Sequence, residues 1–332
     1  MTMSRAEIQG IEPTAVAPGG RLVVRGTGFA VRPGQVPQVT LGGESVRVVR
    51  ASSRVVVVEV PADAAGGQQA LAIEGLEGST PYVIVGKVLA TGVHQVDSPA
   101  YDREGRLHAT LSGQRGQETP VSVFRIGPDG AREPLVTGLG NATSLAFGPD
   151  GHLYVSSRFE GTVSRVTPDG EVEKFAENLG VAFGLAFTRD GDLLVGDRSG
   201  TIHRVDRHGR HKPLAAIPPS VAAFHLAVAP DDTLIVAAPT LNSSDVLYKV
   251  SPEGEVSRWI EGFGRPQGLA FDAHGVLHVV DALAGDSVVY RIASDGSRTV
   301  AVSGAGLLGV AFDPTDGTMA VCTNDTIYRV AL

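Results

Sequence analysis

The chain has 332 residues, of which 42 are glycine and 20 are proline, and its formal net charge at pH 7 is −8. Residues 1–85 hold seven basic and seven acidic side chains, so the whole negative charge belongs to the remainder of the chain. Non-specific binding to nucleic acid or to an anionic membrane needs a positive surface, and we therefore expect neither a nucleic-acid nor a membrane partner.

Short apolar segments separated by Asp-, Gly- and Pro-rich turns occupy the first 85 residues. This spacing predicts a small all-β sandwich. Gly26 and Gly28 are expected to permit a positive φ or a close approach of two backbones. The expected strands cover residues 22–24, 38–41, 45–49, 54–60 and 69–73.

The same region resembles the IPT/TIG immunoglobulin-like family. The resemblance covers residues 8–85 and rests on Ile11-x-Pro13, Gly19, Gly26-x-Gly28-Phe29, Val39-x-Leu41-Gly42-Gly43, Val58-x-Val60-Pro61 and Gly66. It implies a first domain over residues 1–85. Domains of this family usually serve as spacers or as binding modules, without chemistry of their own.

A repeated unit fills residues 86–332, which we expect to form the second domain. Each unit has an apolar strand with a small residue in its middle, then an Asp/Gly turn, then a second apolar strand. The small residues are Ala100, Ala146, Ala186, Ala227, Ala270 and Ala311. Their spacing of roughly 40 to 46 residues, with about four strands in each repeat, predicts a β-propeller with six blades.

The last repeat lacks its outer strand because the chain ends at Leu332. The segment KVLATG at 87–92 reads like PLVTG at 134–138, the outer strand of the first repeat. We therefore predict that Val85–Gly92 pairs with Ile327–Val330. This pairing would close the ring and cover an otherwise unpaired strand edge.

The repeat resembles the six-bladed propellers of the NHL-repeat and gluconolactonase/regucalcin-like groups, most clearly over Gly268–Asp281. Members of these groups include lactonases, lyases and binding scaffolds, so the resemblance implies the fold more than an activity. It also implies that ligand sites lie on the face that carries the loops between the second and third strands of each blade. Two rings of residues are expected at the channel mouth on this face: Asp97, Thr143, Phe183, Phe224, Gln267 and Leu308, then Ser98, Ser144, Gly184, His225, Gly268 and Gly309.

A metal site is one interpretation of the mouth. Lactonases of the resembling group hold a divalent metal there with Glu, Asn and Asp side chains. Asp97 and Gln267 stand where that resemblance implies Glu and Asn, and the ion would be calcium or zinc. Because calcium needs about six or more oxygen ligands, Phe183, Phe224 and Leu308 weaken this interpretation.

The polar residues near the mouth leave alternatives open. His225 is a candidate general base, or else a histidine that plugs the channel. Asp281 and Asp197 follow strands and either take part in chemistry or cap turns. Arg158 and Arg198 could bind an anionic ligand, or form ordinary surface ion pairs.

The leading functional hypothesis is a non-catalytic binding or scaffold protein. It would present the loop face, with Phe183, Phe224, Arg158, Asp197, Arg198 and Thr143, to a protein partner or a small ligand. The alternative is a metal-dependent lactonase or related hydrolase that uses His225 or Asp281 as its base. Because the first ten residues lack the apolar region of a signal peptide, the chain as given is expected to be cytoplasmic, or extracytoplasmic if a leader was removed.

Overall fold

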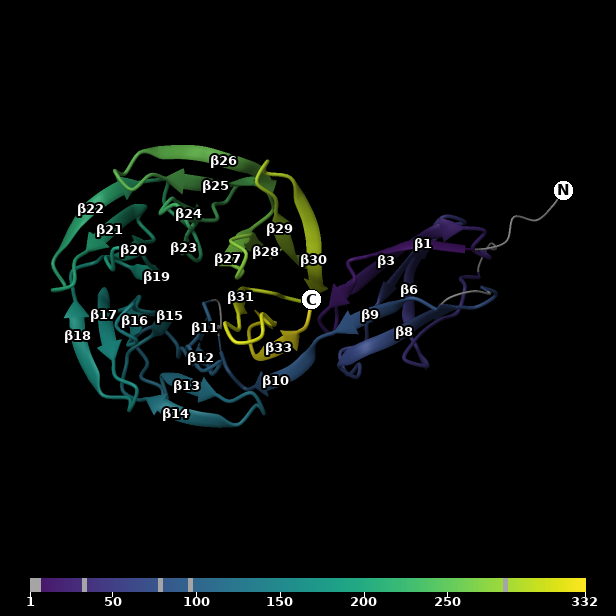
Figure 1. Cartoon of the computed structure of the whole chain (residues 1–332), viewed down its shortest axis with the longest axis horizontal. Coiled ribbons are helices and arrows are strands. Elements are labelled where there is room, and N and C mark those ends of the chain that lie inside the picture. Colours follow the sequence, from purple (N-terminus) through teal and green to yellow (C-terminus); the bar gives the residue numbers. More distant parts are fainter. Residues whose placement is uncertain (1–6, 32–34, 77–79, 95–97, 283–285) are drawn as a thin grey trace.

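The computed structural model describes residues 7–31, 35–76, 80–94, 98–282 and 286–332. All regular secondary structure in these ranges consists of β-strands. Figure 1 shows a ring of sheets with a smaller sandwich beside it. Among these residues, no helix is long and apolar enough to cross a membrane.

Two sheets form the sandwich, with strand orders β1-β3-β7-β6 and β2-β9-β8-β4-β5. The strands are β1 (Glu7–Glu12), β2 (Ala15–Val16), β3 (Arg21–Thr27), β4 (Val39–Leu41), β5 (Glu44–Ser45), β6 (Arg47–Ala51), β7 (Val55–Glu59), β8 (Gly67–Ile73) and β9 (Tyr82–Val85). The strand expected over 45–49 is divided, because the chain passes from one sheet to the other at the buried Val46.

The two glycines singled out in the sandwich serve the two purposes expected of them. Gly28 has a φ of 73°, a backbone angle that residues with a side chain rarely adopt. A Cβ on Gly26 would lie 2.1 Å from the carbonyl oxygen of Glu7 and 2.7 Å from the ring of Phe29. Gly26 therefore lets β1 and Phe29 approach β3 closely.

In the described part of the chain, six groups of four antiparallel strands make up the ring. Five of these groups are separate sheets. Strands one to four of each group run from the axis outward (Figure 1). The first three blades are β11 (Ala100–Tyr101), β12 (Leu107–Thr110), β13 (Val123–Ile126) and β14 (Arg132–Val136); β15 (Ala142–Phe147), β16 (Leu153–Ser157), β17 (Thr162–Val166) and β18 (Val172–Ala176); and β19 (Ala182–Phe187), β20 (Leu193–Asp197), β21 (Thr201–Val205) and β22 (His211–Ala216). The others are β23 (His225–Val228), β24 (Leu234–Ala237), β25 (Asp245–Val250) and β26 (Val256–Phe263); β27 (Pro266–Phe271), β28 (Leu277–Asp281), β29 (Ser287–Ile292) and β30 (Arg298–Gly304); and β31 (Gly309–Phe312), β32 (Met319–Cys322), β33 (Thr326–Val330) and β10 (Lys87–Thr91).

Ring closure follows the prediction. β10 is the outer strand of the sixth blade and pairs antiparallel with β33, with Lys87 opposite Arg329 and Ala90 opposite Ile327. The side chain of Ala90 packs into the core between the first and sixth blades, while Val88 is exposed. The chain therefore joins the end of its last blade to a strand that precedes the first.

The sandwich is also joined to the propeller through the fifth blade, which the sequence did not predict. β2 lies between β30 and β9 and is parallel to both, so one sheet of nine strands runs from the fifth blade into the sandwich. Ala15 and Ala17 are buried with Val302 and Leu307 in the core between the fifth and sixth blades. The sandwich is thus packed against the propeller through backbone pairing and side chains together.

Ser303 holds this junction with its hydroxyl, which donates to the carbonyl oxygen of Arg21 (2.5 Å) and accepts from the Arg21 amide (3.1 Å). We expect Ser303→Ala to lower the free energy of unfolding by about 1–2 kcal/mol, because two backbone groups lose their partner. Urea unfolding measures the change. The exposed Ser257→Ala on β26 is the control, and an equal effect of the two variants would contradict a role for Ser303 in the junction.

Candidate functional site

The inner strands β11, β15, β19, β23, β27 and β31 surround the channel, and Figure 1 shows them nearest the centre of the ring. The segments that lead into these strands bring residues from several blades to one mouth. Asp97, the first expected metal ligand, lies outside the described residues. The other expected mouth residues can be placed.

A chain of hydrogen bonds crosses the mouth. The hydroxyl of Ser144, on β15, donates to the Ser98 hydroxyl at 2.8 Å. The Ser98 oxygen lies 3.2 Å from Nδ1 of His225, at the start of β23. Residues that precede the first blade and begin the second and fourth blades are thereby linked, although they are up to 127 positions apart in the sequence.

His225 is buried, with 2% of its surface exposed. Burial lowers the pKa of its imidazole to about 4, although the nearby Gln267 side chain acts in the opposite direction. The ring is therefore neutral at pH 7. Its Nε2 atom is buried and makes no hydrogen bond of normal geometry with the residues described. A buried polar atom of this kind calls for a partner.

The structure also places other residues that were expected at the mouth. The ring of Phe183 meets the imidazole edge to face, with centroids 6.2 Å apart. Gln267 is buried. Thr143 is buried too, and its hydroxyl donates to the carbonyl oxygen of Asn141 at 2.7 Å. The mouth is thus lined by neutral polar groups and an aromatic ring.

Phe183 and Phe224 were expected to meet a ligand, but both are buried, with 3% and 0% of their surface exposed. The ring of Phe224 packs against Gly196, where a Cβ would come within 2.3 Å of it. A ligand could contact Phe224 only after the side chain moved. Contact of either ring with a ligand stays a prediction.

The carboxylates next to the mouth are bound to backbone amides. Asp281 accepts from the amides of Gly264 (3.0 Å) and Arg265 (2.6 Å). Asp197 accepts from the amide of Val181 (2.8 Å) and from the amide and hydroxyl of Ser199. This geometry favours the turn-capping interpretation of both residues.

Asp281→Asn is therefore expected to lower the free energy of unfolding by about 1–3 kcal/mol, because a buried, charge-assisted pair of hydrogen bonds is weakened. Thermal unfolding, checked by circular dichroism, measures this. Asp295→Asn, in an exposed turn, is the control. A stability equal to that of wild type would show that the Asp281 carboxylate is not a structural cap.

The two arginines expected to bind an anion make other contacts. Arg198 donates to the carbonyl oxygen of Val221 at 2.8 Å, and its Nε is buried without a partner among the described residues. Arg158 donates to the Ser112 hydroxyl at 3.4 Å. Anion binding by this pair stays a prediction.

The described residues do not fit a hard metal ion at the mouth. Calcium needs several carboxylate oxygens, but those of Asp197 and Asp281 are bound to backbone amides. The remaining donors there are the Gln267 amide, two serine hydroxyls and a neutral imidazole. No group of three or more His, Cys, Asp or Glu side chains in the described ranges is arranged to hold a metal.

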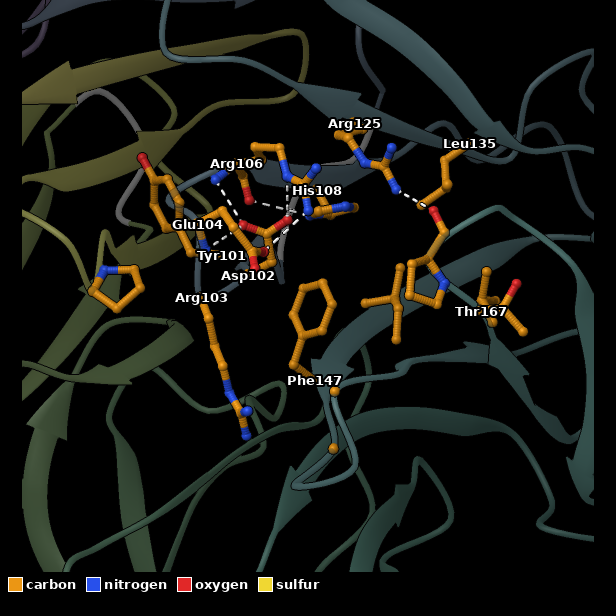
Figure 2. A pocket seen from close by; sticks show the side chains of 16 residues that line it. Tyr101, Asp102, Arg103, Glu104, Arg106, His108, Arg125, Leu135, Phe147 and Thr167 are labelled. Atoms are coloured by element: carbon orange, nitrogen blue, oxygen red, sulfur yellow. Dashed lines mark hydrogen bonds and ion pairs between the residues drawn. The ribbon is translucent and has the colours of Figure 1, made fainter.

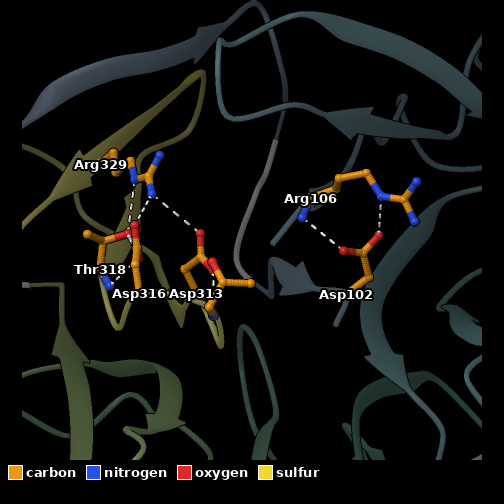
Figure 3. Close-up of polar contacts among 7 residues, drawn as sticks. Asp102, Arg106, Asp313, Asp316, Thr318 and Arg329 are labelled. Carbon is orange, nitrogen blue, oxygen red and sulfur yellow. Dashed lines mark hydrogen bonds and ion pairs between the residues drawn. The ribbon is translucent and has the colours of Figure 1, made fainter. Parts of the chain in front are cut away.

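The opposite face of the propeller carries a set of ion pairs that the sequence reasoning missed. An arginine of the third strand pairs with a carboxylate near the first turn of the same blade, as in Arg165–Asp150 (2.9 Å) and Arg204–Asp192 (2.7 Å). In the sixth blade Arg329 pairs with Asp316 and, at 3.5 Å, with Asp313 (Figure 3). The signal was present in the recurring basic residue of the third strand.

Comparison with known proteins supports the two-part fold. The model of the IPT/TIG domain family matches residues 6–84. A search of curated proteins found no match. An auxiliary nutrient binding protein from Bacteroides thetaiotaomicron is similar in structure, with a TM-score of 0.59 and 13% identity over 99% of this chain and 98% of that one.

Two further solved structures cover the propeller. A candidate gluconolactonase has a TM-score of 0.60 at 17% identity, over 74% of this chain and 90% of that one. Virginiamycin B lyase from Staphylococcus aureus has a TM-score of 0.52 at 15% identity, over 73% of this chain and 95% of that one. At these identities the likeness shows the fold alone. Residues 6–84 are an IPT/TIG domain, and the rest of the chain is similar in fold to propeller proteins.

Proposed function

We propose that the chain is a non-catalytic binding protein: an IPT/TIG domain to about residue 85, then a six-bladed propeller of the NHL-repeat and gluconolactonase-like group. Its site is the channel mouth on the loop face. One observation carries this proposal: the buried Nε2 of His225 makes no hydrogen bond of normal geometry with the described residues, although the Gln267 side chain is near enough to raise the pKa of the imidazole. The similarity in fold to auxiliary nutrient binding proteins is in keeping with it.

The chemistry of the mouth favours a small, uncharged ligand with hydroxyl or amide groups. His225 is neutral, and its neighbours Ser98, Ser144 and Gln267 are neutral hydrogen-bonding residues. The nearby carboxylates already have partners, so a cationic ligand would find no free opposite charge among them. A small molecule can reach a buried histidine more readily than the surface of a folded partner protein can.

Ligand-observed NMR tests the proposal with neutral sugars, lactones and amides beside their carboxylate analogues. Saturable binding of a neutral compound is expected, weakened about tenfold or more by His225→Ala and Gln267→Ala, because each removes a buried hydrogen-bonding partner. His274→Ala, an exposed residue in a turn of the fifth blade, is the control. Binding of carboxylates alone, or binding that His225→Ala leaves intact, would contradict the proposal.

A hydrolase is the second candidate, and the contact between Ser98 and His225 favours it. A serine oxygen 3.2 Å from a neutral imidazole nitrogen is the arrangement in which a base activates a nucleophile. If this candidate is correct, Ser98→Ala abolishes hydrolysis of an ester or lactone. Under the binding proposal the same variant changes affinity only.

A further inference from the structure

The first blade departs from the ion-pair pattern that the second, third and sixth blades show on the face opposite the channel mouth. Asp102 and Glu104 lie in its first turn, and both are bound by Arg106, at 2.7 and 3.0 Å. Arg125 of β13 holds the place that Arg165 holds in the second blade. Arg125 has no carboxylate within 4.0 Å among the described residues, because the two carboxylates of the turn form ion pairs with Arg106.

Arg125 is incompletely bonded. One terminal nitrogen donates to the carbonyl oxygen of Pro168 in the next blade. Its Nε atom is buried and has no hydrogen-bond partner in the described part of the chain. A guanidinium stays charged at any physiological pH and presents five N–H groups, so an unpaired one in a partly buried place is a ready anion site.

A cavity of about 370 Å³ lies beside this guanidinium, between the first and second blades (Figure 2). Its apolar lining includes Leu135, Phe147, Leu153 and Val166. Figure 2 shows Arg125, His108 and Phe147 among the lining side chains, and the His108 and Phe147 rings meet edge to face with centroids 5.0 Å apart. The volume lies within the range of small-ligand pockets.

The cavity lining carries three positive side chains, Arg103, Arg106 and Arg125, and two negative ones, Asp102 and Glu104, so its net charge is positive. Arg106 neutralises Asp102, and His108 is buried with its pKa lowered to about 4 by that burial, so its ring is uncharged at pH 7. Arg103 turns its guanidinium to the carbonyl oxygen of Pro149. A dianion would add a charge that Asp102 and Glu104 repel, whereas a monoanion matches Arg125 alone.

We propose that this cavity is a second binding site, for a small carboxylate with an aromatic or branched aliphatic body. The carboxylate pairs with the guanidinium of Arg125, and the body packs on Phe147 and Leu135. The site is on the far side of the propeller from the channel mouth and shares no residue with it. If this cavity bound no carboxylate, the function proposed for the channel mouth would therefore be unaffected.

Phenylacetate and phenylacetamide are suitable probes because they differ only in charge and in the polar group. Titration of the full chain, followed by ligand-observed NMR, is expected to give saturable binding of phenylacetate below about 10 mM. Phenylacetamide is expected to bind about tenfold more weakly or not at all, since it cannot form the ion pair. This comparison needs no variant, so it does not depend on how a variant folds.

Arg125→Gln locates the site. It is expected to weaken phenylacetate binding about tenfold or more. Arg291→Gln is the matched control, because Arg291 is exposed at the same strand position of the fifth blade and does not line the cavity. Absence of saturable phenylacetate binding, equal binding of the amide, or equal losses in the two variants would each overturn the proposal.

Discussion

Replacing Ala90 by aspartate is expected to unfold the propeller or to lower its free energy of unfolding by more than about 3 kcal/mol. Ala90 has 5% of its surface exposed and packs against Leu107 and Ile327, where the first and sixth blades meet. A carboxylate there would be buried without a counter-charge. It would also separate the closing strand β10 from β33.

Val88→Asp is the matched control, because Val88 lies on the same strand with 58% of its surface exposed. Its effect on stability is expected to stay within about 0.5 kcal/mol. Chemical unfolding followed by tryptophan fluorescence and circular dichroism compares the two. If both variants were as stable as the wild type, β10 would not be required to hold the ring closed.

Acid is expected to destabilise the fold between about pH 6.5 and pH 4. Burial lowers the pKa of both His225 and His108 to about 4 in the folded chain. In the unfolded chain a histidine titrates near 6.5, so the unfolded state binds more protons throughout this window. Stability is therefore full above about pH 6.5 and is lost as the pH falls towards the folded pKa. For His225 alone the loss is about 3 kcal/mol.

His225→Gln isolates this contribution, because it removes the titrating group. The difference in unfolding free energy between pH 7 and pH 4 is expected to shrink by about 3 kcal/mol relative to wild type. Because the free energies of unfolding at the two pH values are subtracted, any loss of stability that the substitution causes equally at both pH values cancels. His208→Gln, in an exposed turn of the third blade, is the control. The same pH dependence in both variants would mean that His225 is not held neutral by burial.

The repeat period and the likeness of 87–92 to 134–138 predicted how the ring closes, because pairing of outer strands depends on local pattern and chain direction. The junction with the fifth blade was not predictable in this way. β2 has only two residues, Ala15 and Val16, and strands so short carry no periodicity. Its place beside β30 depends on the packing of Ala15 and Ala17 between two blades.

The positions of the residues in the candidate site could be predicted from the sequence, but the surroundings of their side chains could be predicted less well. Alignment of the repeats indicated that Ser98, Ser144 and His225 lie near one another, and hydrogen bonds link them. Alignment gives no side-chain direction, so it could not tell that Phe224 packs inward. Turn capping by Asp281 was one of the two interpretations that its position after a strand allowed, and its bonds to backbone amides favour that interpretation. The unpaired Arg125 was hidden for a similar reason, since it depends on which arginine reaches Asp102.

We expect the channel mouth to bind its ligand without chemical change. The most direct test is hydrolysis of glucono-1,5-lactone, followed by NMR in the presence of added calcium or zinc. If the mouth only binds its ligand, gluconate forms at the rate seen in buffer with the same metal and no protein. Faster hydrolysis that His225→Ala or Ser98→Ala abolishes would contradict it and establish the hydrolase in its place.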